Sequence, residues 1–217
     1  MELSKQIIIW RLLLLDGLPQ TFRLALISIG SAFSLGILLG VVRSKKWPVV
    51  QQVLSVYLGI VRGIPFLLLL LLVYFSTPIK GVFNVSVVTL TIYNSAYIAE
   101  IVRGGIIGLG ENQFKAGKSL GMNSLEVIWY IVLPQVLYYT MPALLGQMVI
   151  LVKGTATCSA IGYTEITRSG TIAMEAYGSP HIIYLEIMLV YFVMCHILTT
   201  IGKHFEAKGK LKMLGKR

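Results

Sequence analysis

The sequence predicts an all-α polytopic membrane protein with five transmembrane helices, the N-terminus outside the cell and the C-terminus in the cytoplasm. Of its 217 residues, 56% are hydrophobic and only 13% are charged, whereas a soluble domain carries about 25% charged residues. Several apolar runs reach the length of about 20 residues that crosses a bilayer. Lys and Arg exceed Asp and Glu by 19 to 9, and their uneven placement gives the orientation.

Five apolar windows qualify as spans in chain order. They are Phe22–Val42, Val53–Ser76, Val82–Val102, Val136–Val152 (which contains Pro142 and Gln147) and Ile182–Ile201. The earlier run Ile7–Leu15 is too short to span and is interrupted by Arg11. We expect it to form an interfacial segment before the first span.

The basic residues outside these windows indicate which loops are cytoplasmic, because cytoplasmic loops collect Lys and Arg. Most lie in the first loop, the third loop and the C-terminal tail: Arg43, Lys45, Lys46, Arg103, Lys115, Lys118, Lys203, Lys208, Lys210, Lys212, Lys216 and Arg217. We therefore predict one transmembrane domain over residues 1–217, with a cytoplasmic loop at 104–133 and a basic cytoplasmic tail at 203–217. This arrangement assigns the net charge of +10 to the membrane surface and not to nucleic acid.

No arrangement of side chains typical of an enzyme is found. Asp16 is the only Asp, the three His residues lack metal-binding spacing, and the two Cys residues form no zinc motif. Gly117-Lys118-Ser119 imitates the end of a phosphate-binding loop, but Asn112 stands where its first Gly belongs. The segment also follows a span and not a β-strand. We expect no nucleotide, metal or other cofactor in this chain, and we expect that it is not an enzyme.

The loop at 104–133 is predicted to hold two short helices. Residues 111–120 form the first, with Glu111 and Lys115 spaced for an i, i+4 pair, and Gly121 suits the left-handed position that ends it. Asn123 begins the second helix with Glu126 in a capping box, and Pro134 stops that helix or begins the next. The first helix offers small residues for close approach by a partner and an apolar side chain for contact, namely Ala116, Gly117 and Leu120.

Polar residues inside the spans are candidate functional groups, because an unpaired polar group is costly in hydrocarbon. Asn94, Ser95 and Gln147 either line a substrate path or join helices by hydrogen bonds. Glu100 and Arg103 are expected to form a structural ion pair. Arg62, beside Gly63 and Pro65, is expected to mark a bend.

Gly121 followed by Ile131-Val132-Leu133-Pro134 resembles the second half of the EAA loop of ABC importer permeases, in which E-A-A, three residues, G and nine residues precede I-x-L-P. Residues 94–106, Arg62-Gly63-Ile64-Pro65 and Lys153-Gly154-Thr155 resemble segments of the polar amino-acid (histidine/glutamine/arginine-type) permease family. The resemblance covers roughly residues 17–205.

The resemblance implies a type I ABC importer transmembrane fold in the bacterial cytoplasmic (inner) membrane. It implies a permease subunit of an ATP-driven importer for polar amino acids, forming the translocation path and coupled to a cytoplasmic ABC ATPase dimer through residues 104–133. ATP and Mg²⁺ then belong to the ATPase. A second permease chain, identical or not, and an extracytoplasmic amino-acid-binding protein complete the set of partners. The alternative is an ATP-independent secondary transporter or channel subunit, which would not need the loop helices.

Three positions depart from the family pattern. Lys115 stands at the Glu of E-A-A, Gly117 replaces the second Ala, and Gly154 stands where an acid usually follows the Lys. We expect Lys115 to meet an acidic or neutral site on the ATPase. The contact shifts to Glu111 in one alternative, and in another Lys115 is only a solvated surface residue.

Overall fold

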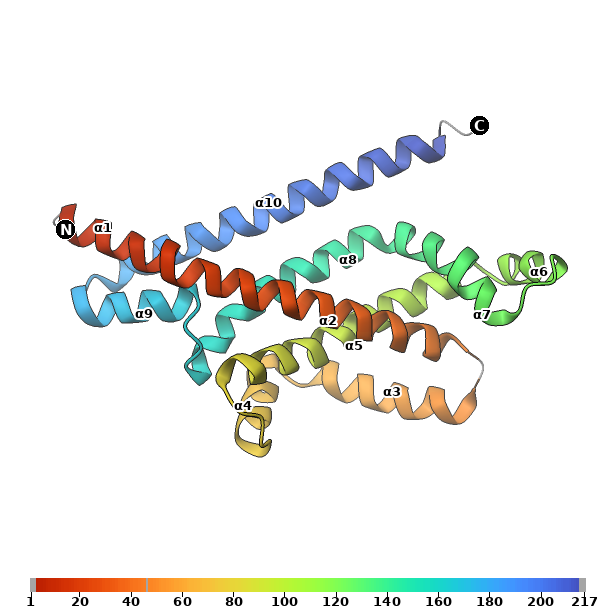
Figure 1. The fold of residues 1–217 in the computed structure, drawn as a ribbon, viewed down its shortest axis with the longest axis horizontal. Coiled ribbons are helices and arrows are strands. Elements are labelled where there is room, and N and C mark those ends of the chain that lie inside the picture. The colour runs from red at the N-terminus through yellow and green to blue at the C-terminus, as the bar shows by residue number, and fades with distance from the viewer. Residues whose placement is uncertain (1–2, 46, 215–217) are drawn as a thin grey trace. The chain divides into compact units, whose positions relative to one another are not determined.

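The computed structural model describes residues 3–45 and 47–214, and its regular secondary structure is helical (Figure 1). The helices are α1 (Leu3–Arg11), α2 (Leu18–Ser44), α3 (Pro48–Gly63), α4 (Phe66–Ser76), α5 (Val82–Gly108), α6 (Asn112–Ser119), α7 (Ser124–Glu126), α8 (Leu133–Thr155), α9 (Ile166–Tyr177) and α10 (Pro180–Leu214). π-Helical turns at Leu12–Gly17 and Val127–Val132 join α1 to α2 and α7 to α8, and a 3₁₀ turn at Ala156–Ile161 follows α8. Some of the basic residues on which the predicted orientation depends are not described. They are Lys46, Lys216 and Arg217, together with the side chains of Lys208, Lys210 and Lys212.

Four helical segments of the described chain are long and apolar enough to cross a membrane: Ser4–Ser44, Val82–Gly108, Ser124–Ile161 and Pro180–His204. A fifth span is possible in length and composition if α3 and α4, which meet at a sharp bend, count as one. The prediction of an all-α polytopic protein is confirmed, with four spans or five.

The window Val53–Ser76, predicted as one span with a bend at Arg62, is divided between two helices. Helix α3 ends at Gly63 and α4 begins at Phe66, with Pro65 in an extended conformation (ψ 135°) between them. Proline has no N–H to continue the ladder and disfavours helical geometry at the residue before it. The hydroxyl of Tyr97 donates to the backbone oxygen of Arg62 at 3.3 Å. The bend expected at Arg62 is therefore confirmed, and a carbonyl beside the break has a partner.

The N-terminal run was predicted to form an interfacial segment separate from the first span, but the structure joins the two. Helix α1 continues through the π-helical turn into α2, so that Ser4–Ser44 forms one helical segment of 41 residues. The buried side chains of Ile9 and Leu13 lie on this segment, and α1 and the turn contact α9. A Cβ on Gly17 would meet the Cα of Ile166 at 2.8 Å. Packing against α9 explains why the segment continues the helix.

The chain divides into two compact units, and the long helices α2, α5, α8 and α10 contribute residues to both. Unit 1 consists of Met1–Ser31, Ile64–Thr91 and Met148–Thr199, and unit 2 of Ala32–Gly63, Ile92–Gln147 and Thr200–Arg217. The core of unit 1 is formed by Leu24, Leu70, Val85, Leu90, Cys158, Ile161 and Tyr163.

In unit 2, small residues bring α2 and α5 together. A Cβ on Gly36 would meet the Cβ of Ile98 at 2.6 Å, and one on Gly40 would meet the backbone oxygen of Ala99 at 2.8 Å. Packing between helices in a membrane depends on this kind of close approach, because burial of apolar surface does not distinguish a helix from lipid. The helix pair fixes the framework on which the candidate site is built.

Candidate functional site

The loop at 104–133, named here the coupling segment, contains the two predicted helices. Helix α6 is followed by Gly121 at φ +80°, and the N–H of Met122 donates to the backbone oxygen of Gly117 at 3.2 Å. A residue with a side chain is strained at this φ, whereas Gly is not. The prediction that Gly121 ends the first helix in the left-handed conformation is confirmed.

The second helix begins with the predicted capping box. The side-chain oxygen of Asn123 accepts from the N–H groups of Leu125 and Glu126, both at 3.0 Å. The carboxylate of Glu126 accepts from the N–H of Asn123 at 2.7 Å. Backbone N–H groups at a helix start have no partner within the helix, so this exchange of hydrogen bonds fixes where α7 begins.

Helix α7 itself ends at Glu126, but the helical path does not stop there or at Pro134. The helical path runs on through the π-helical turn at Val127–Val132 into α8, giving one segment from Ser124 to Ile161. Of the two outcomes predicted for Pro134, the beginning of the next helix agrees with its place in the first turn of α8. The missing N–H of a proline is tolerated in a first turn. The coupling segment is thus continuous with a candidate span.

Gly117 serves contact within the chain. It is buried, and a Cβ there would meet Cγ2 of Val127 at 2.6 Å. Helix α6 therefore packs on the π-helical turn at this glycine, and Figure 1 shows α6 near α7. The sequence suggested that Gly117 allows close approach by a partner protein. In the structure, the segment that approaches Gly117 belongs to the same chain.

Several residues of α6 and of the turn at its end are exposed. Leu120 is 79% exposed and Tyr130 on the neighbouring turn is 77% exposed. The other exposed residues of the predicted contact set are Glu111, Lys115, Ala116 and Gly121. An exposed surface that carries an apolar side chain, an acid and a base gives a protein partner both a hydrophobic contact and charges to match.

A second group of predicted residues meets in the interior of unit 2. Nε2 of Gln147 on α8 donates to Oδ1 of Asn94 on α5 at 2.8 Å, and both residues are buried. The hydroxyl of Ser95 donates to the backbone oxygen of Ile92 in its own helix at 3.0 Å. The structure therefore joins Asn94 to Gln147 and leaves Ser95 bonded locally.

Glu100 lies among three arginines. Its carboxylate pairs with Arg103 one turn along α5 and with Arg43 of α2, and it lies 3.9 Å from the guanidinium of Arg62 on α3. The Arg103 Nε contact is 3.0 Å. The sequence predicted the pair with Arg103 from its spacing of three residues along a helix. It gave no sign of the pair with Arg43, which lies 57 residues before Glu100. The ion pair therefore extends across three helices.

Unit 1 holds a buried acid that the sequence analysis missed. The carboxylate of Glu165 caps α9 by accepting from the N–H groups of Thr167 and Arg168, both at 2.9 Å, and it accepts from the hydroxyl of Tyr191 at 2.6 Å. Burial raises the pKa of Glu165, and these hydrogen bonds oppose the rise. Glu is an uncommon helix cap, so local sequence gave little signal.

These observations define a class: a multi-pass helical protein in which a capped helix outside the apolar core continues into a candidate membrane span. The chain belongs to the family described as "Binding-protein-dependent transport system inner membrane component", which it matches over residues 32–210. It is a multi-pass protein of the cytoplasmic (inner) membrane and a permease of the ABC transporter class. Membership implies an ATPase and a substrate-binding protein as partners.

Curated relatives match this chain over about nine tenths of its length. The probable glutamine ABC transporter permease protein GlnP of Bacillus subtilis is 30% identical over 200 residues, covering 89% of this chain and 92% of the relative. The glutamine transport system permease protein GlnP of Escherichia coli is 28% identical, covering 92% of this chain and 94% of that protein. The glutamate transport system permease protein GluD of Corynebacterium glutamicum is 32% identical, covering 91% and 75%.

Solved structures show the same fold. An amino acid ABC transporter crystallised with histidines superposes with a TM-score of 0.84 at 28% identity, covering 96% of this chain and 99% of that one. The MetNI methionine ABC transporter in an inward-facing conformation gives a TM-score of 0.81 at 19% identity, with the same coverage. The prediction of a type I ABC importer transmembrane fold is confirmed.

Proposed function

We propose that this chain is the permease subunit of an ATP-driven importer for polar amino acids and that the coupling segment transmits ATPase motion to the spans. The observation that carries the proposal is the continuity of the capping box at Asn123 with the helical segment Ser124–Ile161. The relatives, named for glutamine and glutamate transport, support the substrate class. They also favour this function over an ATP-independent transporter or channel.

The energetic demand on the coupling segment is considerable. Reversing a two-state gate from 1:99 to 99:1 takes about 5.5 kcal/mol of differential binding. A flexible loop would absorb a displacement of that kind, whereas a capped helix moves as one body. Helix α6 is held on the π-helical turn by the contact at Gly117, so force applied at the exposed face of α6 reaches α8.

The remaining parts of the assembly follow from the same proposal. The C-terminus and the coupling segment lie in the cytoplasm and the N-terminus outside, in agreement with the distribution of Lys and Arg. Two permease chains form the path, an extracytoplasmic protein delivers the amino acid, and the ATPase dimer binds ATP and Mg²⁺. In this proposal the chain contributes movement of its spans, driven by the ATPase, and needs no cofactor of its own.

Lys115 is proposed to face an acidic or neutral position on the ATPase. It is exposed on α6, one turn after Glu111. Lys115→Glu is expected to reduce copurification of the ATPase and amino-acid uptake, whereas Lys115→Gln, which removes the charge without reversing it, is expected to be milder. Improved assembly and uptake in the Lys115→Glu variant would contradict the proposal.

The path for substrate is proposed to include Asn94 and Gln147, which offer hydrogen bonds to a zwitterion without a fixed charge. The bond between them equally suits a structural link between α5 and α8. Uptake by an Asn94→Leu/Gln147→Leu variant, measured with ATPase assembly verified, separates the two roles. Loss of uptake with intact assembly supports the path, and normal uptake leaves only the structural link.

A further inference from the structure

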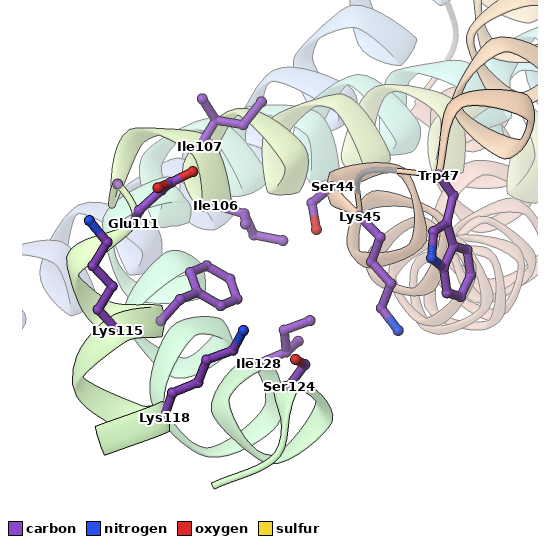
Figure 2. A pocket seen from close by; sticks show the side chains of 12 residues that line it. Ser44, Lys45, Trp47, Ile106, Ile107, Glu111, Lys115, Lys118, Ser124 and Ile128 are labelled. Carbon is purple, nitrogen blue, oxygen red and sulfur yellow. The ribbon is translucent and has the colours of Figure 1, made fainter. Parts of the chain in front are cut away.

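A cavity of about 800 Å³ lies within unit 2, between the C-terminal end of α2 and the coupling segment. Its lining comes from Ser44, Lys45 and Trp47, from the end of α5, from helix α6 and from the start of α7 and the π-helical turn (Figure 2). The cavity is separate from the buried Asn94–Gln147 pair and from the Glu100 cluster, none of whose residues line it. It is therefore distinct from both of those polar clusters, although residues of the coupling segment contribute to its lining.

Positive charge dominates the polar part of the lining. Lys45 and Lys118 point into the open space from opposite sides, whereas Lys115 lies at the outer edge on the side of Glu111 (Figure 2). Glu111 supplies the one carboxylate of the lining. Within the described part of the chain, neither Lys45 nor Lys118 forms an ion pair. Two ammonium groups facing one cavity favour an anion.

The remaining lining is apolar. Ile106 and Ile107 of α5, Phe114 of α6 and Ile128 of the π-helical turn contribute the large apolar side chains of the lining. The ring of Trp47 lies beside Lys45, with the ammonium 4.9 Å from the ring centroid. A small hydrated anion would gain nothing from such side chains. An amphiphile, with a charged head and an apolar body, matches both parts of the lining.

The position of the cavity along the spans indicates the depth at which it opens. Helices α2 and α5 belong to candidate spans and end at Ser44 and Gly108, beside the lining residues. Helix ends that carry Trp and Lys mark the level of the lipid headgroups. Trp47 is exposed there. We therefore expect the mouth of the cavity at the level of the lipid phosphate groups.

We propose that this cavity binds an anionic phospholipid, with the phosphate between Lys45 and Lys118 and the glycerol and first acyl carbons against Ile106, Phe114 and Ile128. A free phosphate ion could also bind between the two lysines, because it carries the same anionic group as the lipid. The apolar side chains of the lining favour the lipid over the free ion. A lipid held here would touch both the end of α2 and helix α6. The inference requires only that the spans lie in a membrane, and it does not depend on the substrate or on Lys115.

Trp47 provides a direct probe. In a Trp10→Phe/Trp129→Phe background, Trp47 is the one remaining tryptophan. The full chain is placed in phosphatidylcholine nanodiscs that contain increasing fractions of brominated phosphatidylglycerol or, in a parallel series, brominated phosphatidylcholine. We expect half-maximal quenching of Trp47 at about tenfold lower mole fraction of the anionic lipid. Lys45→Gln/Lys118→Gln should abolish this preference.

The matched control is Lys80→Gln/Lys203→Gln, which removes the same charge at exposed positions outside the cavity and should keep the preference. Equal quenching by the two lipids, or a preference that survives Lys45→Gln/Lys118→Gln, overturns the proposal. Relief of quenching by millimolar inorganic phosphate at constant ionic strength assigns the site to a free anion and also overturns it.

Native mass spectrometry of the transporter assembled with its ATPase tests the remaining possibility, that an acidic surface of the ATPase occupies the cavity. We expect phosphatidylglycerol to stay bound to the assembled wild-type complex and to be lost from the Lys45→Gln/Lys118→Gln complex. If lipid stays bound to the free chain but is absent from the assembled complex, the ATPase occupies the cavity in the complex. That result would contradict the lipid assignment.

Discussion

Asn94, Gln147 and Glu100 show how single polar residues are accommodated in the apolar interior of unit 2. The two amides bond to each other across α5 and α8, and the carboxylate is surrounded by guanidinium groups. An unsatisfied polar group in hydrocarbon costs several kcal/mol. The loss of stability on removing one partner therefore depends on whether the other partner is still present.

Asn94→Leu alone should lower stability more than Asn94→Leu/Gln147→Leu. The single change leaves the buried Gln147 amide without its side-chain acceptor, whereas the double change removes both groups. A difference of about 1 kcal/mol is expected, read as a lower midpoint of thermal unfolding in detergent. Ser95→Ala, which removes a bond within one helix, is the matched control. Simple additivity of the two Leu substitutions would contradict the account.

Glu100→Gln should destabilise the chain by about 1–3 kcal/mol, because a charged hydrogen-bond acceptor is lost while the arginines stay. The estimate is modest because the carboxylate is 27% exposed, and solvent screens the partly exposed ion pairs. Thermal unfolding compares this variant with Glu175→Gln, a change at an exposed acid. Equal midpoints for the two variants would show that the cluster contributes no net stability.

At the scale of elements, helix α6 and the segment that begins at α7 act together. Their contact depends on Gly117, and the start of α7 depends on Asn123. The two features can be altered separately, one displacing α6 and the other loosening the first turn of the long helix.

Gly117→Ala should displace α6 from the π-helical turn, because the added Cβ would lie 2.6 Å from Cγ2 of Val127. Coupling of ATP hydrolysis to uptake should fall severalfold, with the ATPase still present. Gly117→Ala/Val127→Ala removes the clashing methyl groups and should restore much of the coupling. If the second substitution restores nothing, the packing role assigned to Gly117 is wrong.

Asn123→Ala should cost about 1 kcal/mol through loss of the cap and should weaken coupling, since the first turn of α7 would fray. Asn123→Ser retains a capping oxygen and should behave close to wild type. Hydrogen exchange at the amides of Leu125 and Glu126, which the side chain of Asn123 accepts from, reads out the change directly. Unaltered exchange in Asn123→Ala would contradict it.

At the scale of the whole molecule, the features that the sequence predicted correctly depend on short-range rules. The capping box, the left-handed Gly121 and the bend near Pro65 each arise from a few adjacent residues. The apolar runs likewise depend only on length and composition, and they indicated the spans.

The features that the sequence missed depend on distant contacts. The N-terminal helix joins α2 while contacting α9, and Arg43 reaches Glu100 from another helix. The role of Gly117 depends on Val127, which lies across a turn.

The central claim, an ATP-driven amino-acid permease coupled through the segment at 104–133, is tested most directly by reconstitution. Proteoliposomes would contain the chain with its ATPase and binding protein, and uptake of labelled glutamine would be measured with and without ATP on the ATPase side. We expect uptake that requires ATP and the binding protein and that falls in Gly117→Ala while recovering in Gly117→Ala/Val127→Ala. Uptake by the chain alone, driven by an ion gradient without ATP, would contradict the account.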